Sequence, residues 1–160
     1  MKFDFNNIFQ GLSGNMSRSS AEELEVQFGD YLLDDETIET GFVLLRDSII
    51  FTNLRIIFID KQGTTGKKTA IRTIFLTQIV NVEMETAGRG FDDSEVTIYY
   101  LENVYLRSRE ERISSQKFEF PKKTDITSLY KYLLNLSLLN RSAINDWLIK
   151  KISTQKDSLQ

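Results

Sequence analysis

The sequence contains no cysteine and no histidine. Without cysteine, the chain has no disulfide, no thiolate nucleophile and no cysteine-based zinc site. Without histidine, it lacks the commonest general base and the commonest transition-metal ligand. Catalysis by carboxylates, lysine or tyrosine stays open as a hypothesis, but the sequence offers no matching constellation, and FDDSE lacks the spacing of a calcium loop. We therefore expect no enzyme, no metal and no cofactor.

Proline, glycine and long apolar runs are also scarce. One proline and eight glycines in 160 residues argue against long disordered linkers, and the length suits one domain. No run approaches the ~20 apolar residues of a membrane span. Asp4 interrupts the apolar N-terminus, which therefore differs from a signal peptide. We expect a cytoplasmic protein.

The charge gives no reason to expect a nucleic-acid partner. The formal net charge is −3, whereas a nucleic-acid-binding domain typically has a pI above about 9. Basic residues are scattered along the chain, so a local cluster would have to hold any anionic partner.

Residues 39–120 are typical of short antiparallel strands. Seven segments are rich in β-branched and aromatic residues and are separated by turn signals: IETGFVLLR, IIFT, RIIFID, TAIRTIFL, IVNVEMETA, EVTIYYLE and KFEF. Val80, Val82 and Met84 alternate with polar residues, which predicts a half-buried strand. RIIFID is continuously apolar and is expected to lie centrally. Seven strands are close to the number that curls into a sandwich or a partly closed barrel.

A helix is predicted before the strands. It is expected to start near Ser19, where serines precede two glutamates. Leu24, Phe28 and Leu32 then recur four residues apart, and Gly29 weakens or ends the helix.

Helical spacing returns after Pro121, and this last helix is expected to cover an open end of the barrel. Thr124 or Asp125 can cap the helix, and Asn140 is expected to stop it. A second helix follows, with Trp147 on its apolar side. The apolar face of the first of these helices is formed by Ile126, Leu129, Leu133 and Leu136.

The loop KQGTTGKKT, from Lys61 to Thr69, contains the glycines, the Gly-Lys pair and the threonine of a phosphate-binding loop. Such a loop needs four residues between its glycines and a helix after them. Here two threonines separate Gly63 from Gly66, and a strand-like segment follows. The loop is therefore predicted to be a hairpin tip, where lysines usually serve solubility.

Four basic residues of this hairpin remain candidates for binding an anionic headgroup. They are Lys61, Lys67, Lys68 and Arg72, which would converge near the mouth of the hairpin. Each basic residue near an anionic membrane is worth about 1 kcal/mol. Four of them would support a transient contact and not stable anchoring.

The N-terminal segment carries more large apolar residues than one barrel needs: Phe3, Phe5, Ile8, Phe9 and Leu12. They are candidates for an oligomer interface, for docking on their own domain or for membrane contact. Trp147 presents the same choice, because tryptophan is enriched at interface hot spots and can equally pack onto the barrel.

The central sequence resembles the bacterial pleckstrin-homology (PH) domain family over about residues 8–139. The matching motifs are GLSGN at 11–15, FTNLR at 51–55, DKQGTTGKK at 60–68 and ETAG at 85–88. The resemblance implies a strongly bent barrel of seven strands capped by a C-terminal helix, and homo-oligomers that assemble into rings. It implies no settled ligand. The chain departs from the family pattern in a longer excursion at 107–112 and in the helix that carries Trp147.

Three segments and two functions are expected from these observations. Residues 1–36 form an N-terminal extension and helix, residues 37–140 the PH-like barrel with its capping helix, and residues 141–160 a helical extension and tail. The leading hypothesis is a non-catalytic interaction module that self-assembles into a homo-oligomer and binds protein partners. The alternative is peripheral binding of anionic lipid through residues 61–72, although fold alone does not establish a ligand.

Overall fold

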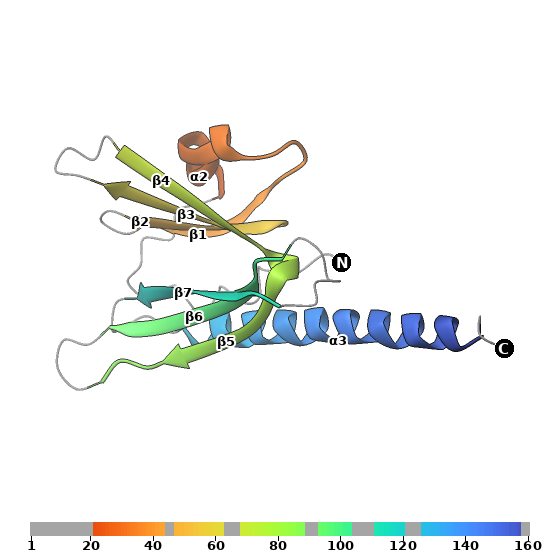
Figure 1. Ribbon diagram of the computed structural model, residues 1–160. Helices are drawn as coiled ribbons and strands as arrows, with labels where there is room; N and C mark the ends of the chain where they lie inside the picture. Colours follow the sequence, from red (N-terminus) through yellow and green to blue (C-terminus); the bar gives the residue numbers. More distant parts are fainter. Residues whose placement is uncertain are drawn as a thin grey trace.

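The computed structural model describes residues 21–43, 47–62, 68–88, 93–103, 111–120 and 126–157. Within these segments, helix α2 (Ala21–Phe28) and the 3-10 turn η2 (Gly29–Tyr31) precede seven strands, and helix α3 (Thr127–Asp157) follows them. The predicted mostly-β class with a helix at each end is confirmed (Figure 1).

The seven strands form two antiparallel sheets, with the orders β1-β2-β3-β4 and β5-β6-β7. Their bounds are β1 Ile38–Val43, β2 Asp47–Thr52, β3 Arg55–Gln62, β4 Lys68–Phe75, β5 Ile79–Glu85, β6 Ser94–Leu101 and β7 Ile113–Phe120. The turn η3 (Leu76–Gln78) links the two sheets, and Figure 1 shows them diverging from that end. The seven predicted antiparallel strands are therefore all present.

The main core lies between the two sheets and against α3. Strand alternation sends Val82, Ile98 and Phe120 into it, as the sequence pattern predicts. The ring of Phe42 packs edge-on against Phe51, at 6.2 Å between centroids, and against Phe120, at 5.9 Å. Burying one such side chain contributes about 1.5–3 kcal/mol. These contacts join the two sheets into one unit.

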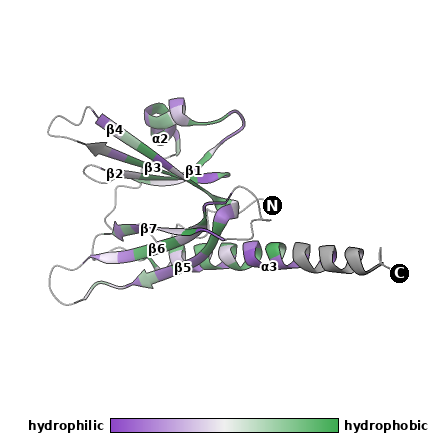
Figure 2. Ribbon diagram, viewed as in Figure 1, coloured by the Kyte–Doolittle hydropathy of each residue, from purple (hydrophilic) through white to green (hydrophobic). Residues whose placement is uncertain are grey.

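Helix α2 covers the outer face of the first sheet. Leu24 and Phe28 pack there with Ile50, Ile57 and Ile59 in a second apolar cluster. Strand β3 is therefore buried on both faces, which explains its continuous apolar run and confirms its central place. Figure 2 shows this concentration of hydrophobic residues along β3, in contrast to the hydrophilic start of β4.

The close approach of α2 to β1 requires a glycine at position 41. A Cβ atom on Gly41 would lie 2.7 Å from Cδ1 of Leu24 and 3.1 Å from the carbonyl oxygen of Ile49. A residue with a Cβ atom would force the Leu24 side chain or the neighbouring backbone to shift. At its C-terminal end, α2 stops before Gly29, as predicted, and the chain continues as η2.

Helix α3 is continuous from Thr127 to Asp157, so the prediction that Asn140 stops it is wrong. The Asn140 side chain instead donates through Nδ2 to the carbonyl oxygens of Leu76 and Ile79, both at 2.8 Å. Those carbonyls belong to the η3 turn and the start of β5. Asparagine often marks the end of a helix, but here the side-chain amide of Asn140 links α3 to η3 and β5.

The predicted apolar face is confirmed, because Leu129, Leu133 and Leu136 of α3 are buried, as is Ile126 directly before it. The cap candidates Thr124 and Asp125 lie outside the described residues. Beyond the sheets α3 continues as a projecting helix (Figure 1), and the boundary expected between residues 140 and 141 falls inside it. No helix in the described segments combines the length and the apolar character needed to cross a bilayer.

Replacing Asn140 by alanine is expected to destabilise the protein by about 1–3 kcal/mol, because two carbonyl groups lose their hydrogen-bond donor. Urea unfolding followed by circular dichroism measures this change. The matched control is Asn135→Ala, since Asn135 is exposed on the same helix. Equal unfolding free energies for the two variants would show that Asn140 does not fasten α3 to η3.

Candidate functional site

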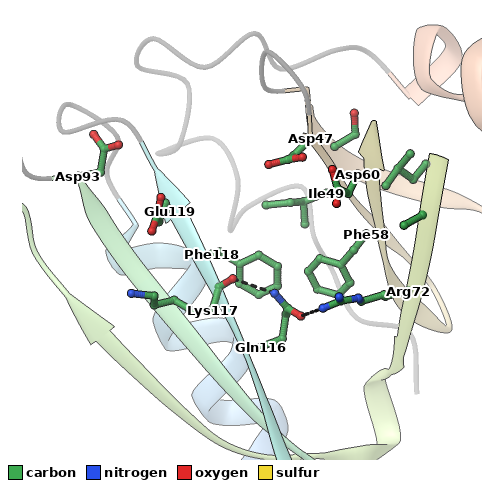
Figure 3. A pocket seen from close by; sticks show the side chains of 13 residues that line it. Asp47, Ile49, Phe58, Asp60, Arg72, Asp93, Gln116, Lys117, Phe118 and Glu119 are labelled. Atoms are coloured by element: carbon green, nitrogen blue, oxygen red, sulfur yellow. Dashed lines mark hydrogen bonds between the residues drawn. The ribbon is translucent and has the colours of Figure 1, made fainter. Parts of the chain in front are cut away.

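A cleft opens between the two sheets, at the end away from η3. It has a volume of about 450 Å³ and is lined by residues of β2, β3, β4 and β7 together with Asp93. We call it the inter-sheet cleft. Figure 3 shows its lining, with Phe58 and Phe118 on the two sides.

The inner face of the first sheet changes from apolar to polar towards this cleft. The strand register places Phe42, Ile49, Phe58 and Arg72 in one cross-strand row, and Asp47, Asp60 and Ala70 in the next row outward. Side chains of successive rows on one face are two residues apart along each strand. The largely apolar row is therefore followed directly by a row that carries two carboxylates at the rim of the cleft.

Two contacts connect the sheets at the floor of the cleft. The rings of Phe58 and Phe118 stack with 4.6 Å between centroids and an angle of 14°. Beside them, Nη1 of Arg72 donates to Oε1 of Gln116 at 3.3 Å. The Gln116 amide also donates through Nε2 to the carbonyl oxygen of Lys117, at 3.0 Å (Figure 3).

Carboxylates outnumber cations among the described residues that line the cleft. Its charged lining residues are the acids Asp47, Asp60, Asp93 and Glu119 and the bases Arg72 and Lys117. Lys117 points away from Phe118 (Figure 3) and pairs with Glu95 at 2.9 Å. The hydrogen bond to Glu95 and its negative charge raise the pKa of Lys117. Arg72 is thus the one cation of this set on the inner face.

Of the four basic residues singled out in the sequence, three lie in the described strands. Arg72 lines the cleft, and Lys68 occupies the same face of β4. Lys61 pairs with Thr69 in the strand register. Lys67 lies outside the described residues. The role of these residues in anion binding remains a prediction.

The candidate interface residues fall largely outside the described segments. Phe3, Phe5, Ile8, Phe9 and Leu12 precede residue 21, where the description begins. Trp147 lies within α3, which extends to Asp157. Among the described residues no group of three or more acidic side chains could hold a metal ion.

Thr52, Asn53 and Arg55 of the motif FTNLR take part in a polar network around the buried carboxylate of Glu36. Nε and Nη2 of Arg55 donate to the two carboxylate oxygens of Glu36, both at 2.8 Å. The hydroxyl of Thr52 donates to the same carboxylate at 2.6 Å, and the Leu33 N–H at 2.9 Å. The Glu36 side chain is fully buried. Asn53 adds a further link, because its Oδ1 accepts from the Thr37 N–H at 3.0 Å.

This network sets the ionisation of Glu36. Burial alone would raise its pKa, but hydrogen bonds from Arg55, Thr52 and the Leu33 N–H, together with the charge of Arg55, outweigh burial and hold the pKa below its usual value. Arg55 also donates to the Tyr31 carbonyl at 2.6 Å. All these partners lie within the protein, so the residues of this motif serve the fold.

A second hollow lies where α3 leaves the second sheet. It has a volume of about 430 Å³ and is lined by Tyr99, Leu101 and Ile113 on the sheet and by Arg141 and Ile144 on the helix, among others. We call it the α3 groove.

The model of the family described as "Bacterial PH domain" matches residues 7–137 of this chain. The chain belongs to the bacterial PH domain family. This finding confirms the resemblance seen in the sequence and accounts for the bent, seven-stranded arrangement of this PH domain.

Individual relatives agree with this assignment. The chain is 44% identical over 92 residues to "Uncharacterized protein YjqA" of Bacillus subtilis (strain 168), which covers 58% of this chain and 74% of that protein. A crystal structure from Shewanella loihica, of a "duf1696 family protein with a pleckstrin-homology domain", is 30% identical with a TM-score of 0.58 and covers 78% of this chain and 99% of the other.

A PH domain protein from Exiguobacterium sibiricum matches with a TM-score of 0.65 over 89% of this chain and 72% of its own, at 22% identity, which shows the fold alone. None of these three relatives is named as an enzyme.

Sequence reasoning missed two residues that organise this PH domain. Glu36 lies in the acidic segment LDDET, which is typical of an exposed turn, and nothing local marks it as buried. Gln116 shares its strand face with Phe118 and Phe120, and that alternation could have identified it as inward-facing.

Replacing Glu36 by glutamine is expected to cost about 3–5 kcal/mol at neutral pH, because Arg55 keeps its charge in a partly buried site without a counterion. Since folding lowers the pKa of Glu36, the stabilisation is present at neutral pH and is lost as the pH falls through the lowered folded-state pKa. Urea unfolding at several pH values measures both effects.

The control for this prediction is Glu22→Gln, because Glu22 is exposed on α2. The difference between wild type and Glu36→Gln should narrow in acid, while the control stays close to wild type throughout. A difference that is unchanged between neutral and acidic pH would contradict the assigned role of the ionised carboxylate.

Proposed function

We propose that this PH domain is a non-catalytic interaction module that assembles with copies of itself and contacts protein partners. The observation that carries this proposal is α3, which continues well past the sheets on which its first half packs (Figure 1). A helix that extends beyond its own domain favours contact with another molecule.

Leu129, Leu133 and Leu136 are buried on the face of α3 that packs on the sheets. In the sequence, further steps of three or four residues lead from Leu136 to Ile144 and Trp147. Isolated helices shorter than ~12–15 residues are only marginally stable in water. The projecting helix would therefore gain stability if another surface covered this face.

In this proposal, the α3 groove of a neighbouring copy receives the projecting helix. Ile144 is half-buried at one wall, and Ile113, with 55% of its surface exposed, lies at the other. If the helix of one copy enters the groove of the next, the contact is heterologous and closes into a ring when the rotation allows. This proposal agrees with the ring assembly that the family resemblance implies.

Replacing Trp147 by glutamate is expected to weaken self-association by about tenfold or more, because a charge would be buried without a partner. Ile113→Glu should act in the same way from the other surface. Light scattering after size-exclusion chromatography, over a range of protein concentrations, measures the assembly and its subunit number. Circular dichroism checks that the variants are folded.

The matched control is Val26→Glu, because Val26 is 92% exposed on α2, away from α3. It should assemble as the wild type does. The proposal would be contradicted if the wild-type protein stayed monomeric at every concentration, or if all variants assembled to the same extent as the wild type.

Peripheral binding of anionic lipid through residues 61–72 is the alternative proposal. The position of Arg72 in the cleft, with Lys68 on the same face of β4, supports it. The carboxylates of Asp47 and Asp60 on the same inner face oppose it, because they repel an anionic headgroup.

Flotation with phosphatidylglycerol vesicles tests this alternative, which expects binding that weakens with salt. Joint Lys68→Gln and Arg72→Gln substitutions should then reduce flotation, whereas Lys131→Gln, at an exposed position on α3, should not. An absence of flotation at low salt would remove the alternative.

A further inference from the structure

We propose that α3 pairs antiparallel with α3 of a second copy of the chain, along a stripe of the helix that does not pack on the sheets. The pairing has two-fold symmetry, so each copy offers the same residues to the other. It is a contact additional to the one at the α3 groove and does not depend on it.

The first observation is a pair of exposed leucines on α3. Leu138 exposes 66% of its surface and Leu134 exposes 38%, whereas Leu133 and Leu136 are buried. Residues four apart on a helix lie one above the other on the same side. Leu134 and Leu138 therefore begin a second apolar stripe, which lies off the face that packs on the sheets.

The second observation is the spacing that continues from these leucines. Steps of four and three residues alternate from Leu134 onwards and lead to Leu138, Arg141, Asn145, Leu148 and Ile152. This alternation is the a/d pattern of a coiled coil, in which each residue packs between residues of a partner helix. All six residues lie within α3, and they span about 27 Å of its axis at 1.5 Å per residue. We call them the α3 seam.

The third observation is the order of residues along the α3 seam. Two apolar residues, two polar residues and two apolar residues follow one another, so the seam reads alike in both directions. Two copies can therefore run antiparallel about the midpoint between Arg141 and Asn145. The opposed positions are then Leu134 with Ile152, Leu138 with Leu148, and Arg141 with Asn145. Such a contact of one surface with itself is isologous, so it closes at two copies.

The two polar residues of the seam decide the direction of the pairing. Arg141 and Asn145 are both exposed, and the side-chain oxygen of an asparagine can accept a hydrogen bond from a guanidinium. In a parallel pair, Arg141 of the two copies would meet, and their like charges would repel. A polar residue at a single seam position also specifies the register of a coiled coil. The pattern therefore favours an antiparallel second copy as the partner.

The α3 seam runs past the α3 groove, because Arg141 and Asn145 also border that groove. The opposite wall of the groove is formed by residues of the sheet such as Ile113, which are not part of the seam. Substitutions at Ile113 and at Leu138 therefore test the two contacts separately.

Cysteine cross-linking of the full chain tests the pairing and its direction, because the chain has no cysteine of its own. One preparation carries Leu138→Cys, another carries Leu148→Cys, and the two are oxidised separately and as an equal mixture. We expect disulfide-linked dimers mainly in the mixture. In the antiparallel pair position 138 lies opposite position 148, whereas the two copies of position 138 lie about 15 Å apart along the axis. That separation is too long for a disulfide.

Sedimentation equilibrium in an Ile113→Glu background measures the strength of the pairing without the groove contact. Adding Leu138→Glu is expected to weaken the dimer by about tenfold or more, because a carboxylate would be buried in the seam without a partner. The matched control is Ala143→Glu, since Ala143 is exposed on α3 outside the seam, and it should leave the dimer unchanged. Circular dichroism checks that each variant is folded.

Three outcomes would overturn the proposal. They are disulfides that form as readily in each separate preparation as in the mixture, a Leu138→Glu variant that dimerises as its parent does, and loss of the mixed cross-link when Ile113→Glu is added. The mixed cross-link should also persist when Trp147→Glu is added. Loss of larger assemblies in these two variants together with a retained cross-link separates the pairing from the contact at the α3 groove.

Discussion

The ion pair between Glu36 and Arg55 is the interaction on which the rest of the first sheet depends. It joins the segment before β1 to the start of β3, and the same guanidinium reaches the Tyr31 carbonyl in η2 and the Thr73 hydroxyl in β4. A bidentate pair fixes direction as well as distance. Because η2 is held in this way, α2 is kept over the outer face of β2 and β3, and the inner face is left to form the core and the cleft.

This arrangement separates the residues that stabilise the fold from those that are available to a partner. The polar side chains of FTNLR form hydrogen bonds within the protein. Thr52 and Asn53 accept from backbone N–H groups, and Arg55 is paired with Glu36. The polar groups of the cleft lie on β2, β3, β4 and β7, at its rim, where replacing one hydrogen bond by another costs little. The most recognisable part of the sequence therefore identifies the family, whereas the cleft and α3 carry the proposed contacts.

The strands and their burial could be predicted from the sequence because alternation is a local signal: Val82, Ile98 and Phe120 show which face is inward. Asn140 was misjudged because its partners, Leu76 and Ile79, lie some sixty residues away in the chain. Glu36 was missed for the same reason, since its burial depends on Arg55. The grouping of Lys61 with Arg72 was based on the hairpin tip, whereas in the strand register Lys61 pairs with Thr69 and Arg72 pairs with Phe58. Local patterns thus predict elements, while sites depend on long-range pairing.

Amide hydrogen exchange of the full chain, measured at low and at high protein concentration, tests the proposed self-assembly. If another copy of the chain covers the projecting part of α3, amides beyond Ile144 should exchange quickly in dilute protein and become protected as the concentration rises, while those of β3 stay protected throughout. Protection of the projecting helix that is independent of concentration would contradict it.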